Sequence, residues 1–89
     1  MNVAGVLVHA DPSHAPQVRE RVEQLAGVEV HAISPAGQLV VTAERDDDAG
    51  MLATLEALRA TPEVYSVTLV YHHSEPDDAQ RIAKREQTP

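Results

Sequence analysis

The sequence predicts an α+β fold in which a four-stranded antiparallel sheet carries two helices on one face. Apolar residues repeat with a period of about two in four segments and of about 3.6 in two others. The segments follow the order strand, helix, strand, strand, helix, strand. The chain has 89 residues, the length of one small domain.

The first half is predicted to form a strand, a helix and a strand. Residues 3–10 are rich in β-branched side chains and end at the turn signal Asp11-Pro12. Residues 13–26 carry apolar side chains at helical spacing, with Pro16 in the first turn and Gly27 as a left-handed terminator. Residues 28–34 then alternate between apolar and polar side chains, as a strand buried on one side does.

The second half is also predicted to form a strand, a helix and a strand, and its first strand pairs with the last strand of the first half as a hairpin. Residues 34–37 predict a turn and residues 38–44 resume the strand, so the two strands pair. Three consecutive aspartates, residues 46–48, supply a cap and negative charge where a helix dipole favours it. The helix follows on the stripe Met51, Leu52, Leu55 and Leu58 and is closed by Thr61-Pro62, and residues 64–73 form the last strand.

Two βαβ-like halves with right-handed crossovers close most simply into a ferredoxin-like βαββαβ sandwich. We expect this domain to cover residues 1–74. Residues 75–89 hold one large aliphatic side chain, Ile82, and are predicted to form a polar, solvated tail that is transiently helical between residues 78 and 85. The fold leaves one face of the sheet without helices, and this face is the informative one.

Alternation along each strand assigns its side chains to the two faces. The residues predicted to face the helices are Val6, Val8, Val28, Val30, Leu39, Val41, Ala43, Val67, Leu69 and Tyr71. The opposite parity gives Gly5, Leu7, His9, Glu29, His31, Ile33, Gln38, Val40, Thr42, Glu44, Ser66, Thr68, Val70 and His72. A solvated face would normally be polar, whereas aliphatic residues interleave here with threonine and histidine. Two interpretations stay open: a surface on which a partner docks, or residues present only because they favour strands.

Composition excludes several classes of function. A formal charge of −7 argues against binding nucleic acid through its phosphates and favours a cationic partner. The chain has no cysteine, which excludes disulfides and thiol chemistry. It also has no basic region before its first apolar run, and no apolar stretch near the roughly 20 residues that span a bilayer. We therefore expect a cytoplasmic protein without stable membrane insertion.

The five histidines raise the question of metal binding or catalysis. His9, His31 and His72 share the open face in this assignment, but they come from three strands and nothing makes them converge within the ~2 Å bonds that zinc requires. No nucleophile elbow, phosphate-binding glycine loop or carboxylate pair is present. We predict no metal site and no enzymatic activity, and interpret the histidines as a polar rim that changes charge around pH 6–7.

Three segments carry a family resemblance. "GVLVHA" (residues 5–10), "GVEVHAISPAGQLVVTAE" (residues 27–44) and "VYSVTLVYHHSE" (residues 64–75) resemble the strands of the NapD family, over residues 3–75 in all. The resemblance implies a cytoplasmic, ferredoxin-like chaperone without a cofactor. It would bind the twin-arginine (Tat) signal peptide of NapA, the catalytic subunit of periplasmic nitrate reductase, and hold back export until the cofactors are inserted.

The residues and the resemblance together suggest that the signal peptide packs across the open face. The candidate peptide-binding residues are Leu7, His9, Glu29, His31, Ile33, Val40, Thr42, Glu44, Thr68, Val70 and His72. We expect the apolar side of the peptide to rest on the aliphatic residues and its arginines to meet Glu29 and Glu44.

Three other functions stay open at this point. One is an ACT-like module that binds a small molecule at a subunit interface, although the glycine-rich loop common at such sites is missing. Another is a ferredoxin-like metal carrier, but His9-Ala10-Asp11-Pro12 stands where such carriers hold a cysteine pair. The third is an assembly domain that recruits another chain through an exposed strand edge.

Overall fold

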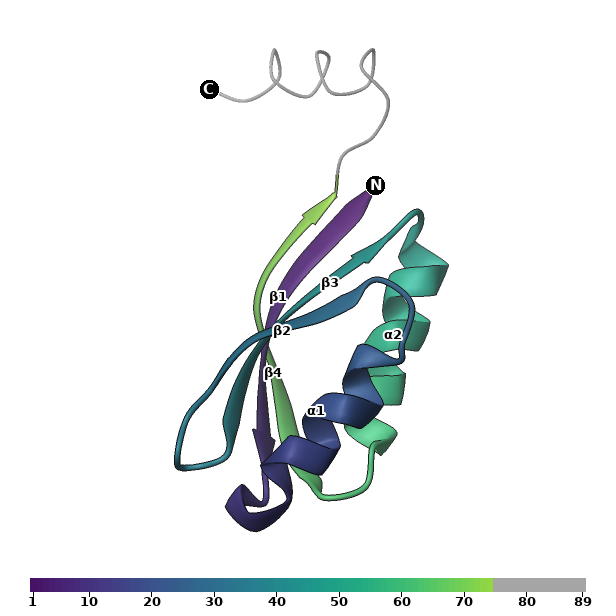
Figure 1. Cartoon of the computed structure of the whole chain (residues 1–89). Coiled ribbons are helices and arrows are strands. Elements are labelled where there is room, and N and C mark those ends of the chain that lie inside the picture. Colours follow the sequence, from purple (N-terminus) through teal and green to yellow (C-terminus); the bar gives the residue numbers. More distant parts are fainter. Residues whose placement is uncertain (75–89) are drawn as a thin grey trace, which may run out of the picture.

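The computed structural model describes residues 1–74, which form one antiparallel four-stranded sheet with the strand order β2-β3-β1-β4. Along the chain, the elements are β1 (Asn2–Ala10), the short 3-10 helix η1 (Pro12–His14), α1 (Ala15–Glu23), β2 (Val28–Ile33), β3 (Gln38–Arg45), α2 (Asp48–Ala60) and β4 (Val64–Ser74). Helices α1 and α2 lie side by side on one face of the sheet (Figure 1). The predicted ferredoxin-like sandwich is confirmed. The predicted tail, residues 75–89, lies outside the described residues.

The hydrophobic core lies between the sheet and the helices. Its largest fully buried side chains are Leu39, Leu58, Val8, Val18, Val22 and Val41. A smaller cluster of Ala4, Ala43 and Met51 continues the core under α2. Burying one such Val or Leu side chain contributes about 1.5–3 kcal/mol, so small aliphatic residues suffice to hold the two layers together.

Local signals in the sequence fix where the helices begin and end. Helix α1 starts two residues later than predicted, because Asp11 first caps η1 by accepting a hydrogen bond from the Ser13 N–H at 3.0 Å. Helix α2 begins after Asp47, whose Oδ1 accepts a hydrogen bond from the Gly50 N–H at 2.7 Å. The turn into β2 passes through Gly27, with a φ of 77° that favours glycine.

The pairing of β1 with β3 is regular, but β-bulges interrupt the two edge strands. Gly5 and Val6 of β1 pair with Tyr71 and Leu69 of β4, so Val70 is an extra residue in β4. A second register shift nearer the start of β4 makes Tyr65 an extra residue as well. In β2, Val30 pairs with Val41 and Ala32 with Val40, so His31 is extra. Each extra residue reverses the alternation of the side chains that follow it.

These bulges correct three predicted side-chain placements. Ile33 pairs with Leu39 and packs against the hydrophobic core instead of lying on the open face. His72 pairs with the buried Ala4, so it also lies on the helix side, where its Nε2 is 2.9 Å from Asn2 Oδ1. Tyr71, predicted to face the helices, pairs with Gly5 and lies on the open face.

Candidate functional site

We call the sheet face opposite the helices the open face. All candidate peptide-binding residues other than Ile33 and His72 belong to it. These are Leu7, His9, Glu29, His31, Val40, Thr42, Glu44, Thr68 and Val70. The structure adds Ala32, Tyr65 and Tyr71 to the same surface, which also holds Gly5 as alternation predicted.

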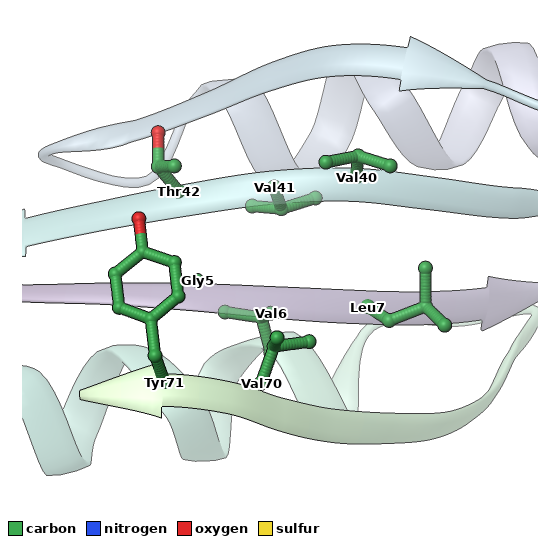
Figure 2. Close-up of a pocket in the computed structure, with 8 residues that line it drawn as sticks. All are labelled: Gly5, Val6, Leu7, Val40, Val41, Thr42, Val70 and Tyr71. Carbon is green, nitrogen blue, oxygen red and sulfur yellow. The ribbon is translucent and has the colours of Figure 1, made fainter.

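A shallow apolar groove of about 230 Å³ runs across β3, β1 and β4 on this face (Figure 2). The residues that line it are Gly5, Val6, Leu7, Val40, Val41, Thr42, Val70 and Tyr71. Val40, Val70 and Tyr71 are 48%, 66% and 49% exposed. Large apolar side chains that are this exposed and gathered in one groove form a surface suited to an apolar partner.

Tyr71 closes one end of the groove by lying across β1. Its ring covers Gly5, and its hydroxyl end points toward Thr42 on β3 (Figure 2). A Cβ atom on Gly5 would collide with the ring carbons of Tyr71. The ring can therefore rest against the sheet only because residue 5 has no side chain.

A polar cluster lies beside this end of the groove, on β2 and β3. His31 Nε2 is 2.7 Å from Thr42 Oγ1, and His31 Nδ1 is 3.6 Å from a carboxylate oxygen of Glu29. The bulge at His31 brings its ring over the neighbouring strand. Glu44 is exposed on the same face, opposite Val3. Three of the candidate residues, Glu29, His31 and Thr42, are thus joined in a contact network.

The other end of the open face carries an aromatic pair. The rings of His9 and Tyr65 pack edge to face, with centroids 5.9 Å apart and an interplanar angle of 88°. Desolvation raises the pKa of the Tyr65 hydroxyl, and the negative charges of Asp11 and Glu63 raise it further. Tyr65 therefore stays neutral at physiological pH.

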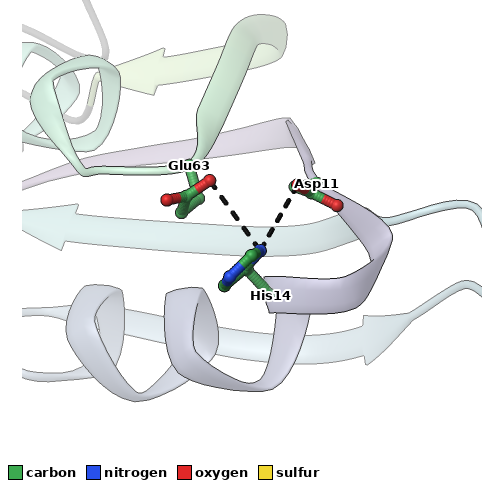
Figure 3. Close-up of side chains that lie close together, drawn as sticks. All are labelled: Asp11, His14 and Glu63. Atoms are coloured by element: carbon green, nitrogen blue, oxygen red, sulfur yellow. Dashed lines mark ion pairs between the residues drawn. The ribbon is translucent and has the colours of Figure 1, made fainter.

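A cluster of titratable side chains lies where β1 leads into η1. It consists of Asp11, His14 and Glu63, whose potential metal-binding atoms all lie within 4.8 Å of one another. His14 Nδ1 is 3.3 Å from Asp11 and 3.8 Å from Glu63, so the group is also held by ion pairs when His14 is protonated (Figure 3). The three residues tie the turn after β1 to the turn before β4. Among residues 1–74, no other group of side chains gathers three such atoms this closely.

Hydrogen bonds from Ser13 to the Asp11 carboxylate lower the pKa of Asp11, and His14 lowers it further. The ionised carboxylate is therefore favoured in the folded state. Its contribution to stability is present above the ordinary pKa of about 3.8 and is lost as the pH falls through the lower folded value.

Sequence reasoning missed Tyr71 and Tyr65 because both follow from bulges in β4. One signal was present: a glycine inside a strand, here Gly5, often marks a bulge or a close approach of another group. Alternation alone gave no reason to act on that signal, since β1 itself contains no extra residue relative to β3.

Comparison with known proteins tests the family resemblance directly. The family model described as NapD protein matches residues 1–76. The chain belongs to the NapD family. Chaperone NapD of Escherichia coli K12 is 33% identical over 75 residues, which covers 82% of this chain and 85% of the relative. Chaperone NapD of Shigella flexneri gives the same identity and coverage.

A solved structure of the NapD family shares the fold. The solution structure of the E. coli Tat proofreading chaperone protein NapD superimposes with a TM-score of 0.75 at 28% identity, over 85% of this chain and 80% of that one. In residues 1–74 of the chain described here, none of the helices is long and apolar enough to cross a bilayer.

Proposed function

We propose that this chain is a cytoplasmic chaperone that binds the twin-arginine signal peptide of NapA and delays its export until the cofactors are inserted. Membership of the NapD family supports a chaperone role, as does the likeness to a protein described as a Tat proofreading chaperone. The single observation that carries the binding site is the exposed apolar groove on the open face. A chaperone of this kind needs a binding surface and no catalytic group.

Apolar burial supplies most of the affinity in this proposal. Twin-arginine signal peptides have a cationic end followed by an apolar run, so they offer an apolar surface to the groove. The groove is lined by Leu7, Val40 and Val70. A peptide can contact these side chains without any change in the sheet. Each buried CH₂ contributes about 0.8 kcal/mol, so a few contacts of this kind give measurable affinity.

Charge supplies orientation and encounter rate. Glu29 and Glu44 stand on the open face and are exposed, so each pair with a peptide arginine contributes only about 0.2–1 kcal/mol. The net charge of −7 attracts a cationic segment from a distance and raises the association rate. Replacing one carboxylate should therefore matter less than removing groove side chains.

Isothermal titration calorimetry with a synthetic NapA signal peptide tests this proposal. The double substitution Val40→Ala/Val70→Ala should weaken binding at least tenfold, and Glu44→Gln less than about threefold. The matched control is Leu52→Ala, because Leu52 is an equally apolar side chain, 57% exposed, on α2. Unchanged affinity in the double variant, or an equal loss in the control, would show that the peptide does not use this groove.

A further inference from the structure

Strand pairing orders the open face into rows of side chains that run across the sheet. From the end where β1 begins, the rows are Glu44–Val3–His73, then Glu29–Thr42–Gly5–Tyr71, then Ala32–Val40–Leu7–Thr68, and then Gln38–His9–Ser66. Neighbouring rows are two residues apart, or about 7 Å along the strands. The charge and polarity of the open face can therefore be compared row by row from one end to the other.

The two ends of this face differ in charge and polarity. Both carboxylates, Glu44 and Glu29, lie in the first two rows, and no lysine or arginine of residues 1–74 enters any of the rows. Arg45 lies on the helix side, where its Nη1 donates a hydrogen bond to Thr54 Oγ1 at 2.9 Å. The third row is apolar except for Thr68 and adjoins Val70, while the fourth is polar and contains no carboxylate. Within the rows, carboxylates that can receive a cationic group thus lie at one end only; beyond the fourth row, Asp11 and Glu63 lie next to Tyr65 but are already paired with His14 when it is protonated.

Tyr71 stands at the boundary between the acidic and the apolar rows. Its ring rests on Gly5 with one face turned toward solvent (Figure 2), and the side chain is half exposed. Guanidinium groups stack on aromatic faces of this kind through cation–π attraction. Glu29 shares the row with Tyr71 but stands on the opposite edge strand, about 14 Å away across the sheet, so its carboxylate can accept hydrogen bonds from the other arginine of the pair and not from the stacked one.

We propose that the Tyr71 ring, seated on Gly5, stacks on an arginine guanidinium of the signal peptide and so sets the direction in which the peptide binds. This inference rests on the proposed function. The twin-arginine end lies over the rows of Glu44 and Glu29, and the apolar run continues over Leu7 toward His9. Between Gly5 and His9 the strand rises about 13 Å, which about nine residues of a helical peptide cover.

A thermodynamic cycle tests the stacking contact. Calorimetry compares the native signal peptide with a peptide in which both arginines are replaced by glutamine. Tyr71→Leu should weaken the native peptide about 3- to 10-fold and the glutamine peptide less than about 1.5-fold. The control Tyr65→Leu removes the tyrosine at the far end of the same face and should change both affinities by the same factor. A Tyr71→Leu loss that is equal for the two peptides, or absent for both, overturns the contact.

The direction of the peptide is tested on the wild-type protein, so it does not depend on a variant that folds. A nitroxide spin label next to the arginines should broaden the amide signals of Gly5 and Thr42 most strongly. A label at the far end of the apolar run should instead broaden those of His9 and Ser66. The reverse pattern overturns the inference.

The two proposals fail in different ways. If the native peptide binds wild-type protein and the cycle or the labels give the contrary result, only the arginine contact and the direction are wrong. If the native peptide does not bind wild-type protein at all, the proposed function is wrong and the inference falls with it.

Discussion

Gly27 and Gly5 both lie against another part of the chain, but the neighbouring atoms differ in how far they can move. A Cβ on Gly27 would meet the backbone carbonyl of Glu44, and the φ of 77° adds strain for any other residue. A Cβ on Gly5 would meet only the ring of Tyr71, a half-exposed side chain that can rotate away. Substitution should therefore be costly at Gly27 and mild at Gly5.

We expect Gly27→Ala to lower the free energy of unfolding by about 2 kcal/mol or more, because it combines left-handed strain with a clash against the backbone of β3. Gly5→Ala should lower it by about 1 kcal/mol or less. Urea denaturation of the two variants measures both values. Equal losses, or a larger loss at Gly5, would mean that Tyr71 is fixed in place more firmly than its exposure indicates.

The bulges in the edge strands decide which side chains of those elements reach the open face. Alternation predicts β1 and β3 correctly throughout, because no extra residue interrupts their pairing. It fails in β2 after His31, and in β4 both at Tyr65 and after Val70. A bulge depends on how a strand pairs with its neighbour, so it leaves no trace in the periodicity of the strand's own sequence. Bulged edges also discourage pairing with another chain.

Ile33 and Val40 test the bulge in β2. Simple alternation puts both on the open face, whereas the structure packs Ile33 against the core and leaves Val40 48% exposed. Ile33→Ala should lower the free energy of unfolding by about 2 kcal/mol, and Val40→Ala by less than about 1 kcal/mol. Urea denaturation again supplies the measurement. Two small, equal losses would indicate that Ile33 faces solvent and that the bulge is absent.

At the scale of the whole fold, residues 1–74 form a sheet that their two helices cover on one side only. Three features follow from the sequence: the packing of two helices on one sheet, the apolar stripes of the helices, and an open face that is apolar with carboxylates at its border. Each depends on the periodicity or charge of a single segment, which can be read without knowing how the segments pair. The groove itself was not predictable. Its closed end depends on Tyr71 crossing to Gly5, a contact between residues far apart in the chain and displaced by a bulge.

The family assignment was also predictable, because it depends on short segments that can be recognised in the sequence itself. The quoted strand segments span residues 5–75, and the family model matches residues 1–76. Three short segments in the right order suffice where each alone would not. The choice of NapA as the client stays a proposal, because it depends on the partner and not on any feature of this fold.

In the function proposed above, the open face receives the signal peptide and the helical layer does not. Titrating isotope-labelled protein with a synthetic NapA signal peptide and following the amide signals by NMR tests it most directly. We predict that the largest shift changes fall on Gly5, Leu7, Val40 and Val70, with α1 and α2 little affected. If the largest changes fell on α1 and α2 while these groove residues stayed unchanged, the signal peptide would bind the helical layer and not the open face.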